Sequence, residues 1–169
     1  YVGGTGATGF QGTPGTLHPS YLGGNSDAFV VKVDPSGHVL WATLLGGNQY
    51  DRAYAVEVDS AGFIYVAGRA GNGFQTTECA LQKTFAGDLD LNPAYGVQDG
   101  FVAKITPDGK QLVWATYIGD TGRGFIRDID LDSKGNVWAA FSTVSPAFPY
   151  ITANAVQPTA TFSRNPAII

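Results

Sequence analysis

The feature that most constrains the fold of this chain is a hairpin pattern that occurs twice. Residues 53–68 read AYAVEVDSAGFIYVAG, a strand of alternating apolar and acidic residues, a tight Asp-Ser-Ala-Gly turn and a β-branched, aromatic second strand. Asp can hydrogen-bond the backbone two residues on, and Gly accepts the positive φ that closes such a turn. The pattern returns over residues 125–141 as FIRDIDLDSKGNVWAAF. A hairpin that recurs along one chain indicates a repeat architecture.

A second pair of segments repeats in the same order. Residues 27–37 (DAFVVKVDPSG) match residues 99–109 (DGFVAKITPDG), and both predict a strand that ends in a Pro-x-Gly turn. A partner strand with a Trp-Ala-Thr centre follows each, so Trp41 and Trp114 occupy equivalent positions. We expect these indole rings to fill the gap between neighbouring sheets; a ligand-stacking platform is the alternative.

The composition agrees with a β protein rich in turns. Of the 169 residues, 44% are hydrophobic, only 14% are charged and 23 are Gly, and no long helical periodicity is present. The net charge of −4 and the lack of a basic run argue against nucleic acid as a partner. No apolar segment has the length of a membrane span, and the single cysteine, Cys79, excludes an internal disulfide.

The repeat unit is a meander of four short strands that returns about every 64 to 73 residues. This favours a β-propeller blade over a sandwich, which would not need the same Asp, Phe, Trp and Gly in the same order. The predicted fold class is all-β: a β-propeller segment of four-stranded antiparallel blades, about two and a half blades in length. Residues 1–50 and 120–169 are expected to form partial blades, and residues 51–119 a complete blade with an insertion at 88–95. We expect the chain to be part of a larger propeller; closure by oligomerisation is the alternative.

The amino-acid sequence of the repeat resembles that of a known family. The segment at 27–37, the sequence WATLLGG at 41–47 and VDSAGFIYVAG at 58–68 are similar to the bacterial SBBP-type β-propeller repeat. The last of these is also similar to NHL repeats. The resemblance implies an extracellular or cell-surface bacterial protein in which the propeller is a scaffold or adhesion module. With an NHL-like strand order, Val56 and Val58 would pack between blades, on the strand that lines the central channel.

The insertion carries a candidate calcium site. Side chains with oxygen ligands occupy the first, third and fifth positions of a possible calcium loop, and an Asp falls at the twelfth. The predicted ligands are Asp88, Asp90, Asn92 and Asp99. Pro93 stands where such loops need Gly, and Asp99 has a counterpart, Asp27, in a copy without the insertion. A solvated acidic loop is therefore the alternative.

A second acidic group is Asp128, Asp130 and Asp132. On a strand these residues share one face. Their counterparts in the other copy are Ala55, Glu57 and Asp59, so only Asp132 repeats a turn residue. The group predicts an acidic ladder facing the channel, which could bind a cation or polar ligand. A hydrated channel without a ligand is the alternative.

The sequence has no pattern typical of an enzyme. His18 and His38 have no spacing that suggests a metal site or a triad, and nucleophile elbows and phosphate loops are absent. We therefore expect a non-enzymatic propeller module with no cofactor except calcium. Its expected partners are the remaining blades of its parent chain or other subunits, and a glycan is a further candidate. A carbohydrate- or calcium-binding module and an accessory propeller of a secreted enzyme are the alternative functions.

Overall fold

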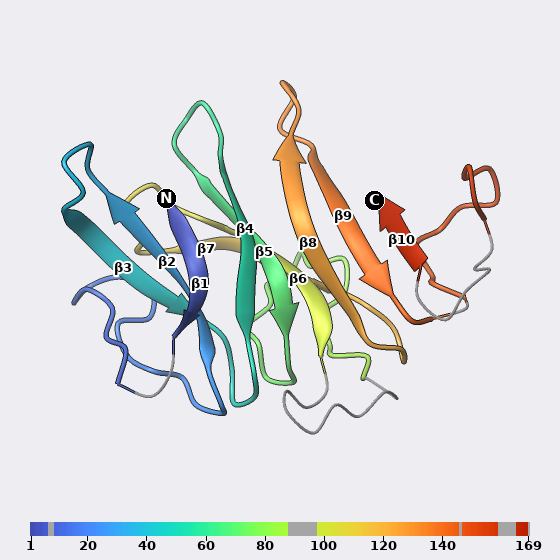
Figure 1. Cartoon of the computed structure of the whole chain (residues 1–169), viewed down its shortest axis with the longest axis horizontal. Coiled ribbons are helices and arrows are strands. Elements are labelled where there is room, and N and C mark those ends of the chain that lie inside the picture. The colour runs from blue at the N-terminus through green and yellow to red at the C-terminus, as the bar shows by residue number, and fades with distance from the viewer. Residues whose placement is uncertain (7–8, 88–97, 146, 159–164, 169) are drawn as a thin grey trace.

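The computed structural model describes residues 1–6, 9–87, 98–145, 147–158 and 165–168. All regular secondary structure in these segments is β-strand, arranged as three antiparallel sheets that follow one another across the molecule (Figure 1). The predicted all-β propeller-type fold is confirmed. Within the same segments, no helix has the length and hydrophobicity to cross a membrane.

Each sheet is a meander in which sequence neighbours are hydrogen-bonded neighbours. The first sheet has the order β1 (Val2–Gly6), β2 (Asp27–Val33), β3 (Val39–Leu45). The second has the order β4 (Arg52–Val58), β5 (Ile64–Ala70), β6 (Asp99–Ile105), β7 (Leu112–Ile118). The third has the order β8 (Gly124–Leu131), β9 (Val137–Thr143), β10 (Asn165–Ile168). We refer to them as the first, second and third blades.

The sequence repeat shows which strands of the three blades are equivalent. β1 corresponds to β5, so the first blade has the equivalents of β5, β6 and β7. β8 corresponds to β4, so the third blade has the equivalents of β4, β5 and β6. Only the second blade has all four strands among the residues that the structure describes.

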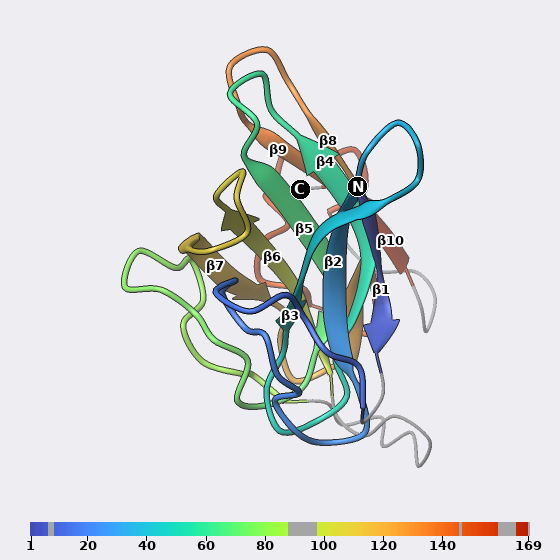
Figure 2. The ribbon, with the colours of Figure 1, turned by 90° about the vertical axis from the view of Figure 1, so that its left-hand side faces the viewer.

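The two repeated hairpin turns have the geometry that their residues predict. Gly62 and Gly135 have φ values of 86° and 82°, a region in which other L-residues are strained. Asp59 Oδ1 accepts hydrogen bonds from the backbone N–H groups of Ala61 (3.0 Å) and Phe63 (2.9 Å), and Asp132 closes the second turn in the same way. Both turns extend from the same end of the molecule (Figure 2).

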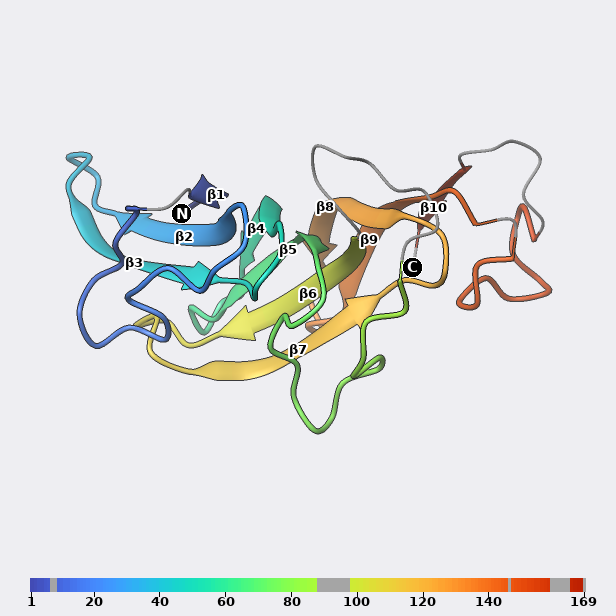
Figure 3. The same cartoon turned by 90° about the horizontal axis from the view of Figure 1, so that it is seen from below.

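The blades pack face to face through two hydrophobic clusters, and the fanned arrangement is visible in Figure 3. The cluster between the first and second blades includes Ala28, Val30, Trp41, Leu45, Ile64, Val66, Phe101, Ala103, Ile105, Ala115 and Tyr117. The cluster between the second and third blades includes Ala55, Tyr65, Ala67, Val102, Ile118, Ile126, Ile129, Ala139, Phe141 and Phe148, with Trp114 packed against it. The stability of the array depends on these interfaces, because a single blade buries little by itself.

The tryptophan prediction is confirmed. Trp41 is buried against the second blade, and an added Cβ at Gly109, in the turn between β6 and β7, would touch its ring. Trp114 packs towards the third blade and makes an edge contact with Tyr65, with ring centroids 6.0 Å apart. Both rings therefore lie between sheets, as expected from their equivalent positions.

The prediction for the valines of β4 is right for one residue and wrong for the other. Val56 packs against the cluster between the first and second blades. Val58 is 38% exposed, because it is the last residue of β4, where the chain leaves the sheet for the turn. Ala53 and Ala55 supply the buried surface of this strand instead.

Candidate functional site

Three of the four predicted calcium ligands, Asp88, Asp90 and Asn92, lie outside the described residues. The fourth, Asp99, is fully buried at the start of β6. Its Oδ2 accepts a hydrogen bond from the backbone N–H of Ala86 at 2.8 Å. One oxygen of this carboxylate therefore holds the end of the loop that leads from β5 to β6.

The same arrangement occurs at the repeat-equivalent position in the first blade. Asp27 begins β2, is fully buried, and accepts the N–H of Leu22 on Oδ2 at 2.6 Å. A glycine follows the last strand of both these blades, Gly46 after β3 and Gly119 after β7. Each Asp occupies the space that a side chain at this glycine would need. An added Cβ would collide with Asp27 at Gly46 and with Asp99 at Gly119. The repeated Asp thus holds the end of the long loop at the start of its own strand, and the repeated Gly leaves space for its carboxylate.

The first of these sites contains a second carboxylate. Asp51, fully buried immediately before β4, accepts the N–H of Gly47 on Oδ2 (2.8 Å) and the N–H of Gly71 on Oδ1 (3.0 Å). An added Cβ at Gly46 would lie 2.6 Å from Asp27 Oδ1 and 2.8 Å from Asp51 Oδ2, so both oxygens face the same small volume. Asp27 Oδ1 has no hydrogen-bond partner.

Burial and mutual repulsion make this pair retain protons. Burial raises the pKa of Asp51 to about 7, and the charge of Asp27 contributes to the rise, although the two backbone donors oppose it. Burial likewise raises the pKa of Asp27 to about 6, against the hydrogen bonds from Leu22 and Gly23. Near neutral pH the pair holds a proton that ordinary aspartates have lost.

A buried tyrosine of β7 extends the hydrogen-bond network of Asp51 through Gly71. The Tyr117 hydroxyl donates to the carbonyl of Gly71 at 2.7 Å and accepts the N–H of Phe74 at 2.9 Å. Burial raises the pKa of Tyr117 well above its ordinary value, and the charges of Asp51 and Asp99 add to this effect. The hydroxyl therefore stays protonated and fixes the start of the loop after β5.

The second predicted acidic group divides between two environments. Asp128 and Asp130 are exposed on β8 and line a shallow hollow of about 180 Å³ together with Trp138 of β9. Asp132 instead belongs to the turn, where its Oδ1 accepts the N–H groups of Lys134 and Asn136. Asp132 thus has the turn position that its counterpart Asp59 predicts, and only Asp128 and Asp130 remain on the strand, which ends at Leu131.

The remaining singled-out residues have ordinary surroundings. His18 Nε2 is hydrogen-bonded to Gln75 (3.0 Å), and His38 Nδ1 is 3.2 Å from Asp34. Cys79 is exposed and free. Over the described part of the chain, no three His, Cys, Asp or Glu side chains come together in a way that could hold a metal ion.

Sequence reasoning missed two groupings. One is the pairing of Asp51 with Asp27, which lie on different blades and become neighbours only when β3 returns beside β2. The other is a set of arginine and aromatic side chains near the start of β4. Arg52 and Arg69 are directly opposite in the β4–β5 register. Counting back from the turn would pair Arg52 with Ala70 instead, because the register shifts between Ala53 and Ala55.

Comparison with known proteins gives one positive finding. The family model described as SBBP, a beta-propeller repeat, matches residues 40–75, from β3 to the segment after β5. A search of curated proteins finds no match. The matched segment contains the Trp strand, Gly46, Asp51 and the first hairpin, the same elements that connect the first blade to the second. The chain therefore carries an SBBP-type β-propeller repeat.

Proposed function

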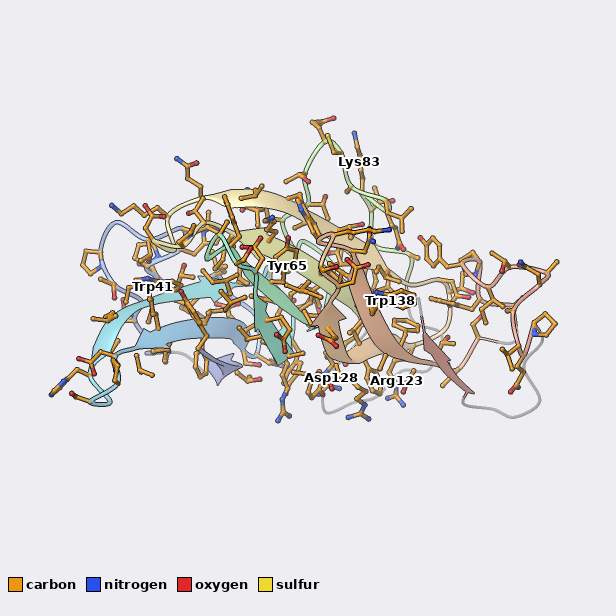
Figure 4. All side chains as sticks on the ribbon, turned by 90° about the horizontal axis from the view of Figure 1, so that it is seen from above. Trp41, Tyr65, Lys83, Arg123, Asp128 and Trp138 are labelled. Carbon is orange, nitrogen blue, oxygen red and sulfur yellow. The ribbon has the colours of Figure 1, made fainter. Side chains whose placement is uncertain are left out.

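We propose that this chain is a non-enzymatic propeller scaffold or adhesion module of an extracellular or cell-surface bacterial protein. The observation that carries the scaffold role is a difference between two equivalent residues. Tyr65 of β5 is 3% exposed because the third blade covers it, whereas Trp138, its counterpart on β9, is 56% exposed (Figure 4). Trp138 thus lies on a face built like a blade interface, and we infer that a further blade covers it.

The exposed edge and face of the first blade support the same conclusion. Among the residues that the structure describes, β1 is hydrogen-bonded to β2 alone, whereas its counterpart β5 pairs with both β4 and β6. Val33 and Val39 are exposed hydrophobic residues of the same blade. Unpaired edges and apolar faces promote association, so a scaffold with further blades explains both ends of the array.

Sedimentation velocity and Trp fluorescence quenching test the scaffold role. In the parent protein that carries the additional blades, the fluorescence of Trp138 should be protected from iodide quenching. Trp138→Glu should weaken the packing of the adjoining blade on the third blade, which sedimentation velocity detects. The same fluorescence measurement on Trp138→Phe identifies its contribution. Equal quenching of Trp138 with and without the adjoining blades would contradict the proposal.

The location is tested separately. An epitope inserted at the exposed turn residue Gly135 should be labelled on intact bacterial cells by a membrane-impermeant antibody. Labelling only after lysis would exclude the cell surface while leaving the scaffold role intact.

A carbohydrate-binding role is the second candidate, and Trp138 also favours it. An exposed indole beside the carboxylates of Asp128 and Asp130 offers a stacking surface with hydrogen-bond acceptors for sugar hydroxyls. Glycan-array binding that Trp138→Ala abolishes would support this role. A blade that buries Trp138 would exclude it.

Calcium binding at the insertion stays a prediction. Asp99 is the only predicted ligand among the described residues, and one of its oxygens already accepts a hydrogen bond from Ala86. Calorimetric titration with calcium, repeated on Asp88→Ala and Asp90→Ala, tests the site directly. No heat of binding at millimolar calcium would favour the solvated loop.

A further inference from the structure

The inner strands of the second and third blades, β4 and β8, are neighbours and carry a reciprocal pattern. At two equivalent positions of the repeat, β4 has Arg52 and Tyr54, whereas β8 has Phe125 and Arg127. Each strand thus offers one cation and one aromatic ring, in opposite order. As a result, Arg127 lies against the rings of both Phe125 and Tyr54. Its Cζ atom is 4.2 Å from the Phe125 ring centroid and 5.5 Å from the Tyr54 ring centroid.

Both strands have an irregularity at the same repeat position. The register of β4 shifts between Ala53 and Ala55, at Tyr54, and that of β8 shifts between Ile126 and Asp128, at Arg127. A β-bulge turns the side chain of the extra residue out of the regular alternation. Tyr54 and Arg127 are thereby directed towards each other across the two blades.

Positive charge gathers around the Tyr54 ring. The Cζ atom of Arg52 is 5.0 Å from its centroid, and that of Arg69 is 5.6 Å away. With Arg127, three guanidinium groups surround one phenol in a chain whose net charge is −4. Cation–π contacts of about 0.5–2 kcal/mol each hold the guanidinium groups at the ring, and an anion is attracted to positive charges gathered in this way.

The carboxylates adjacent in sequence face elsewhere. Asp51 precedes Arg52, but its oxygens accept backbone N–H groups in the buried pair described above. Asp128 follows Arg127, but it lines the hollow beside Trp138 and accepts the N–H of Ile129. Neither Arg52 nor Arg127, both exposed, belongs to any salt bridge within the described part of the chain.

We propose that Arg52 and Arg127, held on Tyr54, bind an oxyanion of the phosphate, sulfate or carboxylate class. Arg52 donates one hydrogen bond to the Tyr50 side chain, but a guanidinium has five N–H donors. A guanidinium over a ring face keeps the remaining N–H groups at its edge available, and their planar fork matches two oxygens of such an anion. The aromatic rings fix the two side chains in advance, which lowers the entropy cost of binding. The site is independent of the proposed scaffold role.

Isothermal titration calorimetry at low ionic strength tests the site, with inorganic phosphate, sulfate and citrate as separate probes. The purified chain should bind at least one of them, and the tightest probe identifies phosphoryl, sulfuryl or carboxylate chemistry. Arg52→Gln and Arg127→Gln should each weaken that binding about tenfold or more, the loss of one charge-assisted contact. Tyr54→Leu should also weaken it, because the arginines lose their support.

Matched controls separate this site from general attraction. Lys110, an exposed cation in the turn between β6 and β7, lies 3.9 Å from Asp108 and away from the arginines. Lys110→Gln removes the same charge and should leave the affinity unchanged. Arg127→Lys keeps the charge without the fork and should restore only part of the binding. Absence of binding for all three anions at millimolar concentration, or equal affinity in parent, Arg52→Gln and Arg127→Gln, would overturn the proposal.

Discussion

Replacing Asp27 with Asn should stabilise the protein above neutral pH, because it mimics the proton held by the carboxylate pair. Asp27 uses Oδ2 to accept the N–H of Leu22, and its Oδ1 faces Asp51 without a partner. An amide can keep the first contact and place its NH₂ group where Oδ1 lies. That group can then donate to Asp51 Oδ2.

The magnitude follows from proton linkage. A folded-state pKa of about 7 for Asp51, against an ordinary value of about 3.9, corresponds to a cost on the order of 4 kcal/mol once the group is ionised. The pKa is raised by folding, so the folded state holds more protons than the unfolded chain between about pH 4 and 7. Stability therefore falls as pH rises through this window and levels off above it. Removing one charge and supplying a donor should recover about 1–3 kcal/mol at pH 8.

Urea denaturation at pH values from 5 to 8.5 measures this effect, with intrinsic Trp fluorescence as the signal. Asp27→Asn should be more stable than the parent at pH 8 and should lose less stability between pH 5 and 8. The turn carboxylates Asp59 and Asp132 do not interfere, because hydrogen bonds to the ionised form lower their pKa values and their contribution disappears only as pH falls below about 4.

The chain offers a matched control. Asp99 has the same position in the second blade, but Gly124 stands where the repeat would place the counterpart of Asp51. Asp99→Asn therefore meets no second carboxylate there and should give no gain at pH 8. If Asp27→Asn destabilises the protein at pH 8, or leaves the pH dependence unchanged, the shared proton is refuted.

Three further predictions concern turns, interfaces and the buried network, each read from the midpoint of urea denaturation. Gly62→Ala should cost about 1–2 kcal/mol because its φ of 86° strains a residue with a Cβ, whereas Ser60→Ala in the same turn should change stability by less than about 0.5 kcal/mol. Tyr65→Ala should cost about 3–5 kcal/mol and Trp138→Ala much less, since only the first is covered by a neighbouring blade; equal losses would mean that exposure does not distinguish them. Tyr117→Phe should cost about 1–3 kcal/mol because its buried hydroxyl satisfies one backbone carbonyl and one backbone N–H; a neutral result would show that these groups find other partners.

Local features of the fold could be predicted because each depends on residues close in sequence. The hairpin turns follow from Asp59, Gly62 and their repeats, since a side-chain acceptor and a positive φ act within a few bonds. The positions of Trp41 and Trp114 between sheets followed from their equivalence in two copies. These inferences compare a segment with its own repeat, so they need no knowledge of distant contacts.

The candidate site was less accessible. The calcium prediction correctly noted that Asp99 repeats Asp27, but the sequence could not show that both are buried against a glycine. The prediction for Val58 failed because a strand pattern does not reveal where the strand ends, whereas the repeat had identified Asp132 as a turn residue. Strand ends depend on the hydrogen bonds that each turn makes, which the alternation of residues leaves open.

The sequence by itself determined the repeat, the all-β class and the turn chemistry, because these arise from periodicity and from the backbone preferences of single residues. Only the tertiary structure decided which side chains from different blades meet. Asp27 joins Asp51, and Arg127 joins Tyr54, across a blade junction and through bulges that shift the register. Such pairings depend on the packing of whole sheets against one another. In a solenoid-like array of this kind, the repeat builds each blade, and the substitutions that break the repeat give each interface its own chemistry.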